Sequence, residues 1–135
     1  MKVKTVELKL KTKGEIEIID LTPKIAEIVE KTKIKNGLAV VFVPGSTAAI
    51  ATIEYEPNLE ADLKDLMRKI APKGVWRHPI NGHSHLRATL LSPSVTIPII
   101  NGKLALGTWQ RVVFVEFDTR PRERKVIVQL IGSEK

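Results

Sequence analysis

The chain of 135 residues has no cysteine, few aromatic residues and no long apolar run. Without cysteine there are no disulfides or thiolate ligands, so only His, Asp or Glu could hold a metal. Aromatic residues make up 4% of the chain, so the core must consist mainly of Val, Ile, Leu and Ala, which favours sheet with some helix. No segment approaches the roughly 20 apolar residues of a membrane span, and the N-terminus lacks the apolar segment of a signal peptide. We therefore expect a cytoplasmic protein without membrane contact.

Acidic residues are also in the minority, with 22 Lys and Arg against 15 Asp and Glu and a formal net charge of +7. Such a basic surface attracts nucleic acid or phosphorylated metabolites. The basic residues are spread over segments 9–13, 31–35 and 120–125 instead of lying in one arm or helix. Because aromatic residues that could stack on bases are scarce, a small phosphorylated ligand is the stronger expectation and a nucleic-acid-binding module the weaker one. Abundant Lys, Glu, Ile and Val without Cys is typical of a thermophile.

The length suits one domain over residues 1–135, and there is no internal repeat or linker. Alternating polar and apolar residues predict strands at 3–10 and 15–20, joined as a hairpin. Helical spacing predicts helices at 22–33, with Thr22 as N-cap and Pro23 in the first turn, and at 57–70. Further strands are predicted at 38–43, which should be buried and central, and at 47–55, 95–100, 104–106, 111–117 and 125–131, although 47–55 also fits a helix. Residues 83–91 fit a helix or a strand. The pattern indicates one compact α+β domain.

All three histidines, His78, His83 and His85, lie within eight positions. Imidazole titrates near neutrality and is the commonest metal ligand, so this cluster is a candidate site. In a strand, His83 and His85 would share a face and could bind one ion or anion. In a helix they would diverge by about 200°, and only one could serve. The alternative is that these histidines are structural and held by hydrogen bonds.

A second candidate follows the predicted strand at 38–43, where Gly45 precedes Ser46 and Thr47. Glycine lets the backbone approach a ligand, and two hydroxyls can donate hydrogen bonds, which suits a phosphate or carboxylate. A turn with a capping hydroxyl is the alternative. The segment lacks the lysine and the spacing of a Walker loop, so binding of a nucleoside triphosphate is not indicated.

Several charged residues could complete a site. The carboxylates are Glu54, Glu56, Asp62, Glu116 and Asp118. Glu116 interrupts an apolar strand, and alternation of side chains lets it face solvent. Arg120, Arg122 and Arg124 are predicted at the tip of a hairpin between the last two strands, either as solvated charges or as a contact with an anion or another subunit.

Motifs along the whole chain resemble those of one family. They are Asn-Gly-His-Ser-His-Leu-Arg-Ala at 81–88, Leu-Ser-Pro-Ser-Val-Thr-Ile-Pro at 91–98, Leu-Gly-Thr-Trp-Gln at 106–110, Ser-Thr-Ala-Ala at 46–49, and the closing Glu116, Asp118, Pro121, Arg122, Arg124 and Gly132. On these residues the chain is identified as a member of the YjbQ-like family, which is also named secondary thiamine-phosphate synthase. The resemblance implies a β-sandwich-like, mixed or antiparallel core with two or three helices, a homotrimer, and a pocket between subunits.

The resemblance also implies the chemistry of a thiamine-phosphate synthase, which joins a pyrimidine diphosphate to a thiazole phosphate. Such a site must hold pyrophosphate, usually with a divalent cation. The implied phosphate-binding residues are Ser46, Thr47, Asn81, Arg87 and Ser94. The implied catalytic residues are His85, His78 and Glu54. A divalent metal, Zn²⁺ or Mg²⁺, would be bound by His78, His83, His85 and Asp62. Many members have His where this chain has Gly45. The alternative is a metal- or small-molecule-binding protein without turnover.

Overall fold

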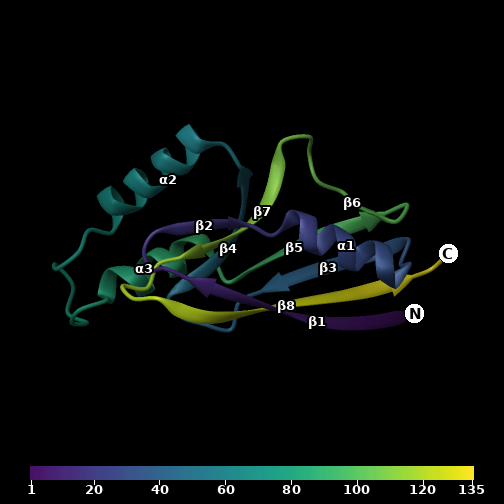
Figure 1. Cartoon of the computed structure of the whole chain (residues 1–135), viewed down its shortest axis with the longest axis horizontal. Coiled ribbons are helices and arrows are strands. Elements are labelled where there is room, and N and C mark those ends of the chain that lie inside the picture. The colour runs from purple at the N-terminus through teal and green to yellow at the C-terminus, as the bar shows by residue number, and fades with distance from the viewer.

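The computed structural model describes residues 1–135 as eight strands and three helices in one α+β domain (Figure 1). In chain order the elements are β1 (Lys2–Thr12), β2 (Glu17–Asp20), α1 (Thr22–Thr32), β3 (Asn36–Phe42), β4 (Ala48–Glu54), α2 (Pro57–Ile70), α3 (Gly82–Leu91), β5 (Ser94–Ile100), β6 (Lys103–Leu104), β7 (Gln110–Glu116) and β8 (Arg122–Ser133). The predicted α+β class is confirmed; of the two segments that fit a helix or a strand, 83–91 lies in the helix α3 and 47–55 contains the strand β4. No helix has the length and apolar character needed to cross a membrane.

The strands form two antiparallel sheets, one with the order β1-β8-β3-β5-β6 and one with the order β2-β7-β4. The predicted N-terminal hairpin is wrong, because β1 pairs with β8 and β2 pairs with β7. The long β1 matches β8 in length, whereas the four-residue β2 completes the smaller sheet, where Ile18 is buried. The central position predicted for β3 is confirmed, since it lies between β8 and β5. The predicted burial holds for one face only, because Ala39 and Val41 are buried whereas Leu38 and Phe42 are exposed.

The main core contains residues from both sheets and from α1, among them Val41, Phe114 and Val128. Helix α1 contributes Ile25 and Val29, which are 0% and 2% exposed. Its N-cap is Leu21 and not the predicted Thr22, whose hydroxyl instead accepts a hydrogen bond from the backbone of β7. As the composition suggests, this core is largely aliphatic.

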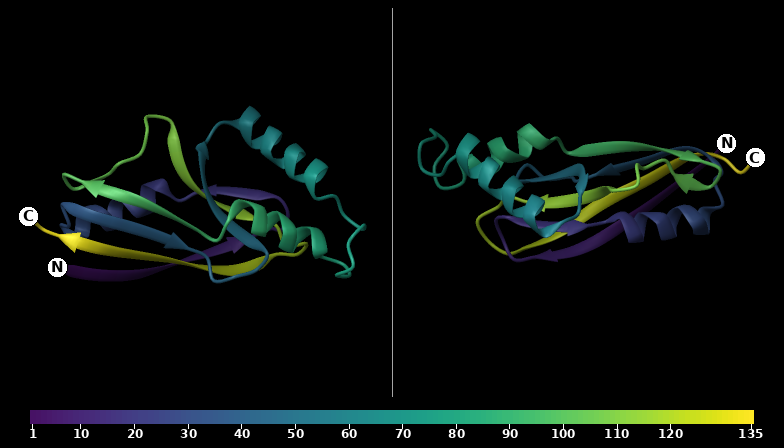
Figure 2. Two further views of the ribbon diagram at one scale, coloured as in Figure 1. Left: turned by 180° about the vertical axis from the view of Figure 1, so that it is seen from behind. Right: turned by 90° about the horizontal axis from the view of Figure 1, so that it is seen from above.

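A second core covers the opposite face of the smaller sheet, beneath α2 and α3. It includes Met67 of α2, Ala88 of α3, and Val113 and Val115 of β7. Strand β7 is therefore buried on both faces, which explains its continuous apolar run. Figure 2 shows α1 near the two chain termini and α3 towards the opposite end of the molecule. The loops that follow β3 and β7 also reach that opposite end.

Candidate functional site

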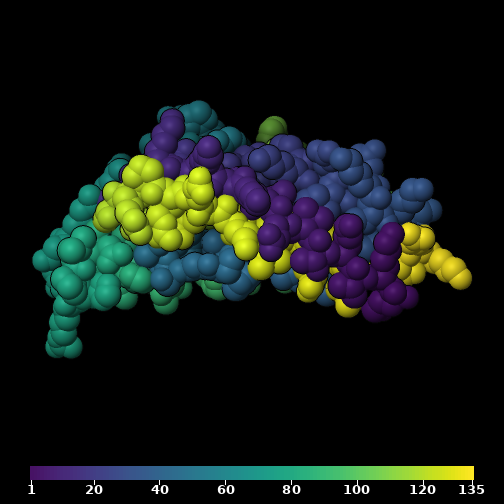
Figure 3. All heavy atoms as spheres, turned by 60° about the horizontal axis from the view of Figure 1, so that its bottom comes forward, coloured from purple at the N-terminus to yellow at the C-terminus, as the bar shows by residue number.

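A polar cleft of about 520 Å³ lies at the end of the molecule remote from the termini. Four of the predicted site residues line it: Ser46, Thr47, Asn81 and His85. Four further charged residues complete it: Asp118, Arg120, Arg122 and Arg124. In Figure 3 the segment that contains these arginines lies against the segment that contains α3. The structure thus brings together the hydroxyl pair, one histidine and the arginine cluster.

The arginine cluster does not lie at a hairpin tip, because β7 and β8 belong to different sheets. The connection after β7 crosses from the smaller sheet to the larger one. It leaves Arg122 and Arg124 at the start of β8, in register with Thr12 and Leu10 of β1. The prediction failed because the length of a connection does not tell whether the strands it joins pair with each other.

A buried ion pair forms the floor of the cleft. Glu116 is 0% exposed and accepts hydrogen bonds from Arg124 Nε at 2.9 Å and Nη2 at 2.5 Å. The hydroxyl of Thr12 donates to the same carboxylate at 2.6 Å, and Arg124 Nη2 also donates to Thr47 Oγ1 at 2.8 Å. The expectation that Glu116 faces solvent is wrong, because alternation in β7 points it between the two sheets, where Arg124 lies.

One nitrogen of Arg124 has no acceptor within the protein. Nη1 makes no hydrogen bond within the protein, and a Cβ atom added to Gly45 would lie 2.9 Å from it. The absence of a side chain at position 45 therefore gives the guanidinium room beside the loop of Ser46 and Thr47. This nitrogen is a donor at the cleft that a ligand could use.

Asp118 holds a second arginine at the cleft. Its carboxylate pairs with Arg122 and accepts a hydrogen bond from the Thr119 backbone N–H at 2.7 Å. Burial acts to raise the pKa of Asp118, but these hydrogen bonds and the charges of Arg122 and Arg124 outweigh it, so its pKa lies below the ordinary value. Arg120 also lines the cleft and has no ion-pair partner. Three guanidinium groups against two carboxylates leave one excess positive charge, which favours an anion.

Helix α3 places His83 and His85 on different faces, as their spacing of two residues predicts for a helix. His83 is 1% exposed and its Nε2 lies 2.9 Å from Glu15 Oε2, while Lys73 pairs with the same carboxylate. Burial acts to raise the pKa of Glu15, but its hydrogen bonds with Lys73 and His83 and their charges keep it below the ordinary value. His83 is thus held by a hydrogen bond to Glu15 and does not line the cleft.

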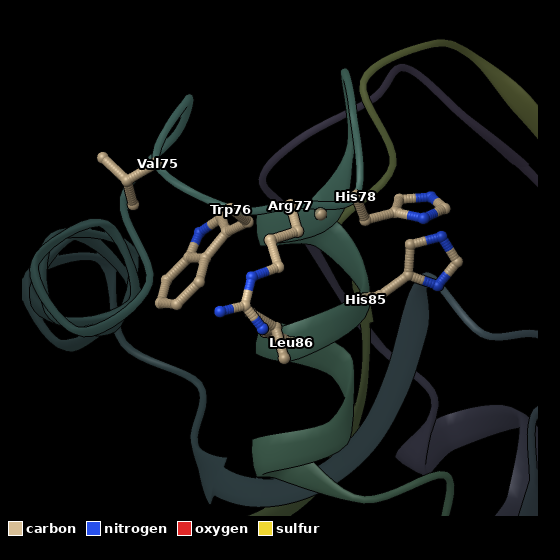
Figure 4. Close-up of a pocket in the computed structure, with 7 residues that line it drawn as sticks. Val75, Trp76, Arg77, His78, His85 and Leu86 are labelled. Atoms are coloured by element: carbon tan, nitrogen blue, oxygen red, sulfur yellow. The ribbon is translucent and has the colours of Figure 1, made fainter.

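His85 instead faces His78, which lies in the loop between α2 and α3. The two rings meet edge to face with centroids 4.8 Å apart (Figure 4). The same loop contains Ile80, whose φ of 71° is unusual for a β-branched residue and whose side chain is 88% exposed at the cleft. Strained backbone of this kind concentrates near functional sites.

The remaining predicted site residues do not line the cleft. Arg87 is 1% exposed on the inner face of α3, where its Nε donates to the Ala71 carbonyl at 2.9 Å and its Nη1 has no partner. Burial lowers the pKa of Arg87. Glu54 ends β4 opposite Gln110, Asp62 is exposed on α2, and Ser94 pairs with Phe42 at the start of β5.

The four predicted metal ligands do not converge. No group of three or more His, Asp or Glu residues is arranged to hold a metal ion. His83 is occupied by Glu15, and Asp62 is on a different helix, so only His78 and His85 lie together. Two imidazoles are fewer than the three protein ligands of a catalytic zinc site, so the residues of one chain do not fit such a site.

Comparison with known proteins gives a consistent result. The sequence model of the family described as "UPF0047 protein YjbQ-like" matches residues 6–133. A UPF0047 protein of Archaeoglobus fulgidus is 44% identical over 129 residues, covering 93% of this chain and 99% of its own. The UPF0047 protein YugU of Bacillus subtilis is 32% identical over 132 residues, covering 93% and 97%.

Solved structures agree with this fold. A hypothetical protein of Aeropyrum pernix superposes with a TM-score of 0.91 and 40% identity, covering 96% of this chain and 99% of its own. A YbjQ-like protein of unknown function from Sulfolobus solfataricus gives a TM-score of 0.88 and 35% identity, covering 98% and 100%. The names of these proteins assign no activity.

Proposed function

The chain belongs to the UPF0047 YjbQ-like family, and on that premise we propose that its cleft binds the phosphate groups of a small ligand as part of a thiamine-phosphate-synthase-like enzyme. The observation that carries this proposal is the set of donors that the protein leaves free at the cleft. Arg120 has no ion-pair partner, and Arg124 Nη1 has no acceptor. Phosphate is the anion whose several oxygens best match guanidinium groups and hydroxyls arranged in this way.

The implied reaction needs such donors. The thiazole nitrogen forms a bond to the methylene carbon of the pyrimidine diphosphate, the C–O bond to the diphosphate breaks, and the diphosphate leaves with the electron pair. Arg120 and Arg122 would stabilise the charge that develops on the leaving group, and the hydroxyl of Ser46 would donate to the same oxygens. His85 would donate a proton or hydrogen bond to them, with its ring orientation fixed by His78.

A binding protein without turnover is the second candidate, and the His78–His85 pair is the observation that favours a metal in that role. Its remaining ligands would have to come from outside this chain. Elemental analysis of protein purified without metal-affinity chromatography tests it. About one Zn²⁺ per chain, lost in His78→Ala, would support the metal; none, with no change in thermal stability on adding Zn²⁺ or Mg²⁺, would contradict it.

We further expect a cytoplasmic homotrimer. The larger sheet supports association because its outer face is covered by no helix and carries an apolar row. Val3, Ile131 and Leu38 are neighbours across β1, β8 and β3 and are 58%, 37% and 43% exposed. Exposed apolar patches of this kind mark interaction surfaces. Light scattering of the purified protein should give three times the chain mass, and Leu38→Glu should lower it; a monomer at all concentrations would contradict the trimer.

The catalytic proposal is tested with purified protein, the two phosphorylated substrates and Mg²⁺. We expect product formation that falls roughly 10²- to 10⁴-fold in His85→Ala, the contribution typical of a general acid. Asp62→Asn is the control, because Asp62 lies outside the cleft. Wild-type rates in His85→Ala would contradict the catalytic role. Diphosphate binding without any product would favour the binding protein.

A further inference from the structure

Two buried hydrogen-bond donors on the inner face of α3 have no acceptor within the protein. They are Arg87 Nη1 and Ser84 Oγ, and their residues are 1% and 0% exposed. Nearly all buried polar atoms of folded proteins have a partner, so two exceptions in one helix need a physical explanation. Residues three positions apart lie on the same side of a helix. The two donors therefore serve the same region beneath α3.

The charge of Arg87 is only partly balanced. Its Nε donates to the carbonyl of Ala71, which caps the C-terminus of α2, where the helix dipole supplies roughly half a negative charge. The charge of Glu15 also acts on Arg87, but the two oxygens of this carboxylate pair with Lys73 and His83. Part of a buried positive charge thus remains without compensation, which is unfavourable in a region shielded from water.

The site is separate from the surface features described above. Neither Ser84 nor Arg87 lines the polar cleft, nor the apolar hollow of about 640 Å³ that adjoins the cleft beside Trp76 (Figure 4). Because both residues are shielded from solvent, their location suits a single small ion and not a phosphate or a carboxylate ligand. The polar cleft and this region therefore differ in the size of the ligand they would take.

Charge distinguishes the two small groups that could accept from these donors. A water molecule would accept their hydrogen bonds but would leave the charge of the guanidinium as it is. A monatomic anion accepts from N–H and O–H groups in any direction, and it cancels the excess charge at the same time. The combination of a buried guanidinium nitrogen and a buried hydroxyl therefore favours an anion.

We propose that Arg87 and Ser84 bind a chloride ion beneath α3. The ion accepts hydrogen bonds from Arg87 Nη1 and Ser84 Oγ and completes the charge balance of this region. Because Arg87 also contacts the end of α2, the ion stabilises the packing of α3 against α2, and it takes part in no reaction. The inference is independent of the phosphate-binding function, since the two sites share no residue.

Urea denaturation in sodium chloride and in sodium gluconate at equal ionic strength tests the proposal. Gluconate is too large for an enclosed site, and urea adds no anion of its own. Once a site on the folded state is saturated, the unfolding equilibrium constant falls in proportion to ligand concentration. We expect a tenfold rise in chloride above saturation to lower this constant by up to about tenfold relative to gluconate. Equal constants in the two salts would contradict the proposal.

Variants locate the effect within the molecule. Arg87→Met removes the charge and keeps a long side chain, so the difference between the two salts should disappear. Ser84→Ala should weaken the apparent chloride affinity roughly two- to tenfold, as expected for one hydrogen bond. Arg68→Met is the matched control, because Arg68 is exposed on α2 and pairs with Asp65. It removes the same charge and should keep the difference between the salts.

Arg120→Ala separates the buried site from the cleft and should also keep the difference between the salts. If the difference is lost in Arg120→Ala and kept in Arg87→Met, chloride binds in the cleft and the buried site is wrong. If Arg87→Met does not fold, Ser84→Ala and the bromide measurement decide.

Crystals grown in sodium bromide give a direct readout, because bromide replaces chloride and scatters anomalously. An anomalous peak at hydrogen-bond distance from Arg87 Nη1 and Ser84 Oγ would support the site. Absence of a peak there would overturn it, and water in its place would identify the partner of both donors. Failure of the cleft to bind diphosphate would contradict the phosphate-binding function and would leave the chloride site standing.

Discussion

Helix α3 turns His83 and Arg87 towards the interior and His85 towards solvent, although the three residues lie within five positions. The inner pair is 1% exposed and is held by Glu15 and by the Ala71 carbonyl. His85 instead lines both the polar cleft and an adjoining hollow lined by Trp76 and Leu86. Residues of one motif therefore divide into a structural set and a candidate functional set, and the 3.6-residue period of the helix decides which is which.

We expect the largest loss of stability for a substitution in the buried ion pair of Arg124 and Glu116 beneath the cleft. Arg124→Met would leave the carboxylate of Glu116, which is 0% exposed, without its cationic partner. We expect the free energy of unfolding to fall by about 3–5 kcal/mol, measured by urea denaturation. Adding Glu116→Gln should recover part of this loss, because the unpaired buried charge is then gone. Equal stability of single and double variants would contradict the ion-pair account.

The same substitution on the two faces of α3 tests the comparison directly. His83→Ala should lower the free energy of unfolding by about 2–3 kcal/mol, since it opens a cavity and removes a buried partner of Glu15. His85→Ala should change it by less than about 0.5 kcal/mol, as is usual for a partly exposed side chain. For phosphate binding we expect the opposite order: among folded variants, His85→Ala should weaken phosphate affinity more than His83→Ala does. Similar stability losses in both variants would refute the division between faces.

Acid pH should remove the stability that Glu15 contributes at the inner face of α3. Since the pKa of Glu15 is lower in the folded protein than its ordinary value of 4.5, the unfolded state takes up the proton first as pH falls. The stability that Glu15 contributes is thus present above about pH 4.5 and is lost as pH falls through its folded pKa. Urea denaturation at several pH values should show a shallower acid decline for Glu15→Gln than for the wild type. An identical decline would contradict a charged Glu15 at this position.

A smaller loss of stability is expected when the packing around Trp76 is disturbed. Gly82→Ala places a methyl group against the Cβ atom of Trp76, which belongs to a fixed part of the side chain, so the loop must move. We expect a loss of about 1 kcal/mol in stability, typical of mild overpacking, and a red shift in the fluorescence of Trp76. The spectrum is best recorded in a Trp109→Phe background, where Trp76 is the only tryptophan. An unchanged spectrum would show that Gly82 does not position the indole.

Local sequence patterns predicted most elements but not their partners. Apolar periodicity located both long helices and nearly every strand, because it depends only on neighbouring residues. The pairing of β1 with β8 joins opposite ends of the chain, so no local pattern indicates it. For the same reason local patterns predict a hairpin between β7 and β8, which belong to different sheets, and do not place Arg122 and Arg124 at the cleft.

Helix α3 shows why 83–91 stayed ambiguous. Its buried face contains His83, Ser84 and Arg87, whereas Leu86 and Leu90 are 39% and 58% exposed. A helix of a globular protein usually buries apolar side chains and exposes polar ones, and α3 does the reverse. The spacing of its apolar residues therefore does not distinguish a helix from a strand. Of the predicted site residues, His85, Ser46, Thr47 and Asn81 line the cleft, whereas Arg87, Glu54, Asp62 and Ser94 lie outside it. The position of a residue in a motif does not tell which way its side chain points.

The central claim is that the free donors of the cleft bind phosphate groups, and calorimetric titration with inorganic diphosphate tests it most directly. We predict one site per chain for the wild-type protein and a loss of roughly tenfold or more in affinity for Arg120→Ala, as expected for one charge-assisted hydrogen bond. Lys9→Ala, which removes an exposed cation outside the cleft, should bind as the wild type does. Absence of binding to the wild type, or equal affinities for Arg120→Ala and Lys9→Ala, would contradict the claim.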